Sequence, residues 1–216
     1  MKPYYDHAGV QIFHGDCREI LPHLPEVDIV LTDPPYGVGM IYGSGTNDDP
    51  NGYWEWFLPL LEDIKKHCSS IIMTHRQEAL RWIHGWDHIC IWNKPMAFGY
   101  AINGWLHHWE PIFIFDKQPD IQYEKDNPKG RKVARFDVIT INTTPNNTGH
   151  PCPKPIKLMS SLLGMFSSNL VLDPFMGSGT TLVAAKNLGR KAIGIEIEEK
   201  YCEIAVNRLS QEVLPF

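Results

Sequence analysis

Short apolar runs alternate with polar, glycine- and proline-bearing segments along the whole chain. Runs such as 27–31 and 170–172 are rich in branched residues, which favours buried strands. Between them, segments such as 53–68 carry apolar residues near helical spacing, which favours helices packed on a core. This alternation predicts an α/β fold, a sheet with helices on both faces.

The same pattern assigns the other elements. Further strands are expected at 11–16, 70–74, 88–92, 111–115, 137–142 and 192–195, and further helices at 18–24, 75–84, 154–166, 182–188 and 198–212. The region 116–135 is different, because lysine, arginine, asparagine, proline and glycine replace the apolar pattern. We expect a single domain over 1–216, with 116–135 as a small inserted basic loop.

Two features stand at the ends of predicted strands. The first is Asp33-Pro34-Pro35-Tyr36, directly after the strand at 27–31. Neither proline can donate to a sheet, so the chain leaves the strand rigidly and displays an acid, carbonyls and an aromatic ring. The carboxylate of Asp33 and the carbonyl of Pro34 could each accept one N–H of a nucleobase amine and free its lone pair, while Tyr36 stacks on the base. An ordinary strand-end turn is the competing interpretation.

The second feature is Asp173-Pro174-Phe175-Met176-Gly177-Ser178-Gly179-Thr180, where a buried strand runs into a glycine-rich turn and a helix. Such a turn allows close approach to a ligand at a helix N-terminus, and Glu196 after the next strand can hold ribose hydroxyls. A dinucleotide site fits poorly, because Leu182 stands where a third glycine is needed. No Gly-Lys-Ser/Thr follows, which excludes a P-loop. S-adenosylmethionine, a nucleoside with a small charged tail, fits better.

Together the two features resemble the S-adenosylmethionine-dependent DNA amino-methyltransferases, in the order of their permuted β group. The likeness covers nearly the whole chain, including Gly15-Asp16-Cys17, Trp92-Asn93-Lys94-Pro95, the stretch 108–115 and His150-Pro151-Cys152-Pro153-Lys154-Pro155. In the last segment the family more often has Thr-Gln where this chain has Cys152-Pro153. The resemblance implies a Rossmann-like class I methyltransferase sheet of seven strands, one of them antiparallel.

The resemblance also implies site roles. The catalytic residues would be Asp33, Pro34, Pro35 and Tyr36. The residues expected to bind S-adenosylmethionine are Asp16, Asp33, Lys154, Asp173, Phe175, Gly177, Ser178, Gly179, Thr180 and Glu196. Asp16 is equally well placed to cap the segment that starts at Arg18. Aspartate at the first position of the tetrapeptide is more usual for N6-adenine enzymes, which makes adenine N6 the expected target. N4-cytosine, RNA or protein-glutamine substrates and a non-catalytic nucleic-acid-binding protein remain alternatives.

DNA contact is expected from the basic residues Lys94, Lys125, Lys129, Arg131, Lys132 and Arg135. A solvated loop at 116–135, or a carboxylate neighbour for Lys94, would also explain them. The glycine-rich segment 37–52 is either a simple connection or a lid over the extruded base. The net charge of −5 weighs against nucleic-acid binding by total charge, although a local basic patch decides the phosphate contact.

The composition limits the cellular location, the metals and the partners that are expected. No apolar run is long enough to span a bilayer and no secretory signal opens the chain, so no membrane association is expected. Five cysteines without a C-x-x-C pair favour reduced thiols in the cytoplasm of a bacterium or of a phage's host. No metal is expected, since zinc-finger and H-E-x-x-H spacings are absent. Double-stranded DNA is the expected partner, dimerisation is plausible because the recognition region is small, and a companion restriction endonuclease is left open.

Overall fold

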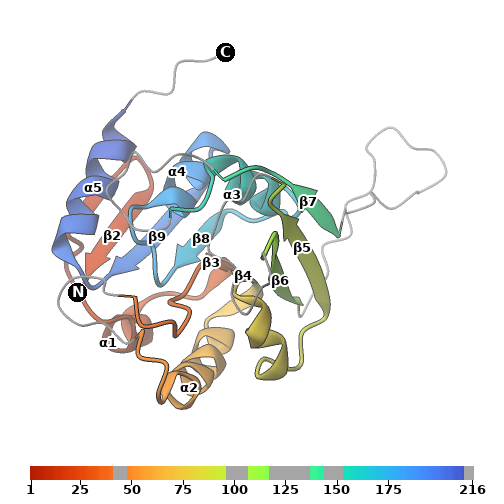
Figure 1. Ribbon diagram of the computed structural model, residues 1–216. Helices are drawn as coiled ribbons and strands as arrows, with labels where there is room; N and C mark the ends of the chain where they lie inside the picture. Colours follow the sequence, from red (N-terminus) through yellow and green to blue (C-terminus); the bar gives the residue numbers. More distant parts are fainter. Residues whose placement is uncertain (41–47, 96–106, 117–136, 144–152, 212–216) are drawn as a thin grey trace.

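A computed structural model describes residues 1–40, 48–95, 107–116, 137–143 and 153–211. These residues form one sheet of nine strands in the order β1-β2-β9-β8-β3-β4-β6-β5-β7 (Figure 1). The strands are β1 (Tyr5–His7), β2 (Val10–His14), β3 (Val27–Thr32), β4 (Cys68–Thr74), β5 (His88–Asn93), β6 (Trp109–Asp116), β7 (Val138–Thr140), β8 (Leu170–Asp173) and β9 (Lys191–Glu196).

Helices cover both faces of this sheet (Figure 1). They are α1 (Cys17–Ile20), α2 (Tyr53–Lys66), α3 (Ile156–Leu163), α4 (Thr180–Asn187) and α5 (Glu199–Ser210), with 3₁₀ turns η1 (Leu21–His23) and η2 (Gln77–Arg81). Helices α1 and α2 pack on one face, whereas α3, α4 and α5 pack on the other. The predicted α/β fold class is thus confirmed. In the part of the chain that the structure describes, no helix is both long and apolar enough to cross a membrane.

Side-chain alternation along the strands divides the core into two layers. On β6, Ile112 and Ile114 join the layer under α3 and α4, while Phe113 and Phe115 join the layer under α2. Neighbouring strands alternate in the same way, because successive side chains of a strand point to opposite faces. A strand buried on both sides needs an almost continuous apolar run, which is the pattern of the central segments.

The strand count and the pairing differ from the expectation of seven strands with one antiparallel. There are nine strands and three antiparallel pairs, β1–β2, β4–β6 and β5–β6. One additional strand, β1, arises from the two-residue turn Ala8-Gly9, whose positive φ angles of 50° and 82° suit a tight hairpin. The segment 137–142 was expected to be extended, and within it β7 pairs in parallel with β5 and forms the edge of the sheet. A strand of only three residues, such as β1, gives little periodic signal.

The segment 75–84 was predicted as a helix and is only the short 3₁₀ turn η2. Arg76 is held extended, with ψ of 158°, and its N–H donates to Nδ1 of the preceding His75 at 2.9 Å. The helix therefore cannot start at His75. Ile83 is buried as expected, but Leu80 is 38% exposed.

The two strands that carry the sequence features are neighbours at the centre of the sheet. β3 pairs in parallel with β8 through Ile29–Val171 and Val30–Leu172. Parallel neighbours end at the same edge of the sheet, so Asp33 and the turn after Asp173 meet there, although 140 positions separate Asp33 from Asp173 in sequence. This is the edge where ligands of open α/β sheets bind.

Candidate active site

A cavity of about 430 Å³ opens at the carboxyl ends of β3, β8 and β9. It is large enough for a small-molecule ligand. Its wall includes all four residues of the Asp33–Tyr36 segment and every residue predicted to bind the cofactor except Gly179. The structure thus brings the two sequence features into one site. Further wall residues are Arg18, Trp56, Glu110, Met159 and Tyr201.

The carboxylate of Asp33 is fully engaged in the free protein. Its Oδ1 accepts hydrogen bonds from the hydroxyls of Tyr36 at 2.8 Å and Thr74 at 2.6 Å. Its Oδ2 accepts one from the ammonium of Lys154 at 2.8 Å. Because Thr74 and Tyr36 hold Oδ1, the direction of Oδ2 is also set, and Oδ2 faces the ammonium of Lys154.

A second carboxylate, Glu110 on β6, lies beside this group. Its Oε1 accepts from Lys94 Nζ at 2.6 Å, and its Oε2 lies 2.9 Å from the hydroxyl of Tyr36 and 3.6 Å from Lys154 Nζ. Burial alone would raise the pKa of Glu110, but the ammoniums of Lys154 and Lys94 outweigh it and lower that pKa. The two carboxylates and two ammoniums balance, so the base of the cavity carries no net charge from these four groups.

The phenol of Tyr36 bridges the two carboxylates. Burial and the nearby charges of Asp33 and Glu110 raise its pKa well above the ordinary value, so it remains a neutral hydroxyl. A single hydroxyl proton serves only one acceptor at a time, so Tyr36 donates to Asp33 or to Glu110. Its ring stacks on His75 with centroids 4.7 Å apart and planes 12° from parallel.

Glu196 closes the opposite side of the cavity at the end of β9. Its two oxygens accept from the backbone N–H groups of Gly177 and Glu198, both at 2.9 Å. Burial raises the pKa of this carboxyl to about 7. A carboxylate held by backbone donors beside a glycine turn is suited to accepting ribose hydroxyls.

Asp173 and Asp16 have structural partners of their own. Burial raises the pKa of Asp173 to about 6, while its Oδ1 accepts from Thr32 at 2.7 Å and from the N–H of Phe175 at 3.1 Å. Asp16 caps α1 by accepting from the N–H of Arg18, and the hydrogen bonds from the Arg18 side chain lower its pKa. Capping by Asp16 was expected, and the carboxylate still lines the cavity.

The glycine turn is supported from the C-terminal helix. Gly177 and Gly179 have positive φ angles of 50° and 77°. A Cβ on Gly179 would lie 2.7 Å from Cβ of Ala205 on α5, so this glycine serves close packing and does not line the cavity. From the same helix, Arg208 Nη1 donates to the carbonyl and hydroxyl of Ser178 and to the hydroxyl of Thr180.

The segment after Tyr36 is held by a buried carboxylate that the sequence did not single out. Asp48 is 1% exposed and accepts from the N–H groups of Gly37, Val38 and Met40 at 2.6, 3.2 and 2.6 Å. Val38 and Met40 line the cavity. Residues 41–47 of the expected lid lie outside the described residues.

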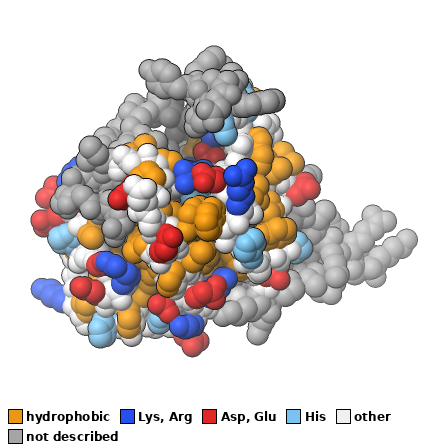
Figure 2. All heavy atoms as spheres, turned by 60° about the horizontal axis from the view of Figure 1, so that its bottom comes forward, with side chains coloured by type: hydrophobic (Ala, Val, Ile, Leu, Met, Phe, Trp, Pro, Cys, Tyr) orange, Lys and Arg blue, Asp and Glu red, His pale blue; other side chains and the backbone are white. Residues whose placement is uncertain are grey.

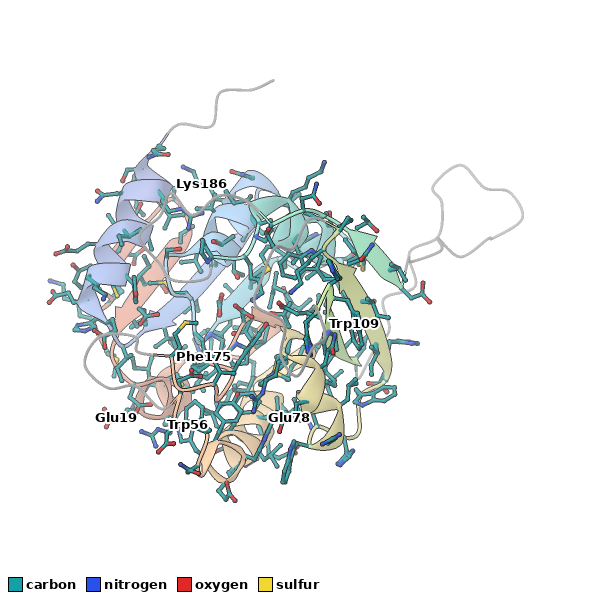
Figure 3. The ribbon with its side chains drawn as sticks, viewed as in Figure 1. Glu19, Trp56, Glu78, Trp109, Phe175 and Lys186 are labelled. Atoms are coloured by element: carbon teal, nitrogen blue, oxygen red, sulfur yellow. The ribbon has the colours of Figure 1, made fainter. Side chains whose placement is uncertain are left out.

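Two aromatic residues from different elements form one wall of the cavity. Trp56 on α2 and Phe175 after β8 meet edge to face with centroids 6.2 Å apart (Figure 3). The buried Nε1 of Trp56 finds no hydrogen-bond partner among the described residues. A cavity with an aromatic wall and carboxylates fits a ligand that combines a flat base with polar groups, as S-adenosylmethionine does.

The predicted DNA contacts are only partly placed. Lys125, Lys129, Arg131, Lys132 and Arg135 lie outside the described residues. Lys94 is buried and paired with Glu110, so the predicted phosphate contact gives way to the alternative of a carboxylate neighbour. On the face shown in Figure 2, basic and acidic side chains lie side by side, so that view shows no region of one charge sign.

Sequence reasoning missed several of these residues. Glu110 is a polar residue near the start of the apolar strand β6, and Thr74 and His75 stand at the end of the apolar strand β4. A polar residue at the end of a buried strand was the signal that could have identified them. Thr32 carried the same signal. Asp48 and Arg208 carried none, because their partners are distant in sequence or are backbone groups.

The sequence profile of the DNA methylase family matches residues 27–207. The type II methyltransferase M.ScaI of Streptomyces caespitosus is 27% identical over 98% of this chain and 84% of its own length. M2.LlaDCHI of Lactococcus lactis subsp. cremoris is 27% identical over 97% of this chain and 93% of its own.

Two solved structures have the same fold. M1.HpyAVI, in complex with SAM, superimposes with a TM-score of 0.69 at 26% identity, over 94% of this chain and 100% of that one. The cytosine-N4-specific PvuII DNA methyltransferase reaches 0.76 at 18% identity, over 99% and 91%, and shows likeness of fold alone. The profile and the relatives agree that the chain belongs to the DNA methylase family of S-adenosylmethionine-dependent amino-methyltransferases.

Proposed function

We propose that this protein transfers a methyl group from S-adenosylmethionine to the exocyclic N6 of adenine at a specific site in double-stranded DNA. One observation carries the proposal: Asp33, with Tyr36 beside it, faces the same cavity as Glu196 and the turn at Gly177. The aspartate at the first position of the tetrapeptide favours adenine over cytosine. The family membership supports the coarser reaction, methylation of an amine in DNA.

Glu196, Asp16, Asp173, Phe175 and the backbone around Gly177 would hold the cofactor, all of them in the cavity wall. Glu196 would accept the ribose hydroxyls, and Asp16 the adenine amino group. When bound, S-adenosylmethionine supplies an activated methyl group, and the protein supplies orientation and electrostatics. No cysteine is needed as a nucleophile. Consistent with this, burial raises the pKa of Cys17 to about 12, so its thiol stays protonated.

Asp33 activates the target amine. Its Oδ1 is fixed by Thr74 and Tyr36, so Oδ2 is the oxygen available to an amino N–H once Lys154 moves away. A second acceptor for Lys154 Nζ, Glu110 Oε2, lies 3.6 Å away. The carbonyl of Pro34 would accept the second N–H. With both hydrogens held, the lone pair of the nitrogen is released from the ring and faces the methyl group.

The reaction must also dispose of a proton. Forming the N–C bond at an amino group releases one N–H proton, while the S–C bond breaks and its electrons remain on sulfur. The carboxylate of Asp33 is the base within hydrogen-bond reach of that nitrogen in this arrangement. The ammoniums of Lys94 and Lys154 keep the neighbouring Glu110 ionised. Lys154 lies beside both Asp33 and Glu110, so its positive charge stabilises either carboxylate.

DNA must deliver the base into this cavity by extrusion from the stack, at a cost of a few kcal/mol. We propose that residues 116–135 contact the phosphates. So small a recognition region also leads us to propose a homodimer on DNA, which light scattering with and without duplex would test.

The decisive experiment is expression in a host that lacks DNA methyltransferases, followed by digestion of its DNA to nucleosides and mass analysis. N6-methyladenine is the expected product, and modification-sensitive sequencing then gives the site. Detection of N4-methylcytosine instead would show that the target base is cytosine. Cofactor and DNA binding without any methylated nucleoside would instead indicate a non-catalytic protein, and parallel assays with RNA and peptide test the remaining substrates.

A further inference from the structure

His75, the residue after β4, is fully buried beneath the Asp33–Tyr36 segment. Its Nδ1 accepts the N–H of Arg76 at 2.9 Å, so the ring proton lies on Nε2. Nε2 is 2.9 Å from the hydroxyl of Tyr53. Burial lowers the pKa of His75 well below its ordinary value, helped by the charges of Arg76 and Lys154, and the ring is therefore neutral.

This tautomer starts a directional chain of hydrogen bonds. His75 Nε2–H donates to the oxygen of Tyr53, and the Tyr53 hydroxyl donates to the carbonyl of Pro35. These two hydrogen bonds hold the Pro35 peptide in one orientation. The carbonyl that is fixed in this way belongs to the tetrapeptide that begins at Asp33.

The same imidazole also orients the aromatic ring of the tetrapeptide. It stacks on Tyr36 with centroids 4.7 Å apart, and on Trp54 of α2 with centroids 5.3 Å apart and planes 26° from parallel. Trp54 is 7% exposed and thus part of the rigid core. One face of Tyr36 is covered by His75, which leaves a base only the other face.

We propose that His75 is a positioning residue for methyl transfer, which fixes the Pro35 peptide through Tyr53 and the ring plane of Tyr36 by stacking. The inference rests on the proposed function, since it concerns the placement of the target amine. His75 touches neither substrate nor cofactor in this arrangement; it acts through Tyr53 and Tyr36. Without His75, the acceptors at Asp33 and Pro34 would no longer be aligned with the target amine of the base.

The test compares four variants in single-turnover methyl transfer, with saturating cofactor and a duplex containing the site found in cells. H75F keeps a ring for stacking but loses both hydrogen bonds, Y53F loses only the hydroxyl, and H75F/Y53F combines them. F57L is the packing control, because Phe57 is fully buried against Tyr53, His75 and Phe175 but takes part in none of the hydrogen bonds of the chain.

H75F and Y53F are each expected to slow transfer about tenfold, the scale of one well-placed hydrogen bond. The double variant should be no slower than the slower single variant, because both interrupt one chain. The KM for cofactor should remain that of the wild type. F57L should lower the melting temperature without changing the transfer rate.

Two results would overturn the inference. If H75F and Y53F lose stability as F57L does but transfer methyl at the wild-type rate, the histidine is only part of the core. Should H75F fail to fold, the isosteric Y53F alone decides by the same criterion. A wild-type protein that binds DNA and cofactor but transfers nothing overturns the proposed function, and the inference with it.

Discussion

Thr32 Oγ1 on β3 donates a 2.7 Å hydrogen bond to Asp173 Oδ1 on β8, and so joins the strand that precedes Asp33 to the strand that precedes the glycine turn. Both side chains are at most 2% exposed. A buried carboxyl depends on such donors, since removing one leaves an acceptor unsatisfied.

Thr32→Val should therefore destabilise the protein by about 1–3 kcal/mol and weaken cofactor binding. Urea unfolding and calorimetry measure the two effects. Thr140→Val is the control, because Thr140 is an exposed threonine on the edge strand β7. Equal stability of the two variants would show that the Thr32–Asp173 bond contributes nothing.

Asp33→Asn should abolish most methyl transfer while cofactor binding is retained. Asparagine keeps the shape and one acceptor, but it neither attracts Lys154 nor receives a proton. A loss of at least a hundredfold in the single-turnover rate is expected, the lower range for removing an acid–base group. Full transfer by this variant would refute the role of the carboxylate.

Substitutions at the two glycines of the turn, Gly177 and Gly179, should have different effects. Gly177→Val places a side chain in the cavity wall and should reduce cofactor affinity, measured by calorimetry. Gly179→Ala drives a Cβ against Ala205 and should instead cost about 1–3 kcal/mol of stability. Comparable losses of affinity in both variants, with stability unchanged, would contradict this division.

Glu196 should make both stability and affinity depend on pH. Its pKa is 4.5 when exposed and about 7 when buried, so between these values the folded protein holds a proton that the unfolded chain has released. Stability from this group falls as pH rises through that window. Ribose hydroxyls prefer the ionised carboxylate, so cofactor affinity should rise from pH 6 to pH 8.

Glu196→Gln is the matching control for both pH effects. It should flatten the decline of unfolding free energy between pH 4.5 and about 7 and remove the proton release that accompanies cofactor binding. Calorimetry in buffers of different ionisation enthalpy measures that release. An unchanged pH profile in the variant would assign the effect to another group.

Asp48→Asn should disturb the segment after Tyr36. The carboxylate accepts three backbone N–H groups, whereas an amide has one oxygen to offer. We expect a lower transfer rate and faster proteolysis after residue 36, with cofactor affinity reduced less. Asp49→Asn, at an exposed neighbour, serves as the control and should behave as the wild type.

The central strands were predictable because a strand that is buried on both faces leaves an almost continuous apolar run in the sequence. The strands at 27–31 and 170–172 are apolar on both faces, and the prolines and glycines after them mark the ends. Asp33, Asp173 and Glu196 meet because β3, β8 and β9 pair in parallel and therefore end at the same edge of the sheet. For the same reason the cavity contains nearly all of the residues predicted to form it.

What escaped prediction depends on contacts that have no period. The helix expected at 75–84 is replaced by a short turn because His75 binds the N–H of Arg76 and is committed to Tyr53. A carboxylate neighbour was one of two expectations for Lys94, but the sequence did not indicate that Glu110 supplies it. Among the described residues, the Asp48 carboxylate accepts only from backbone N–H groups, which every residue except proline has, so the surrounding sequence does not indicate its role.

Arg208 near the end of the last helix gives the turn at Ser178 and Thr180 its support. A ribosome releases the segment around Asp33 long before that arginine. The nascent chain therefore carries Asp33 before the turn at Ser178 and Thr180 is supported, and this wall of the cavity is complete only after residue 208 has been made.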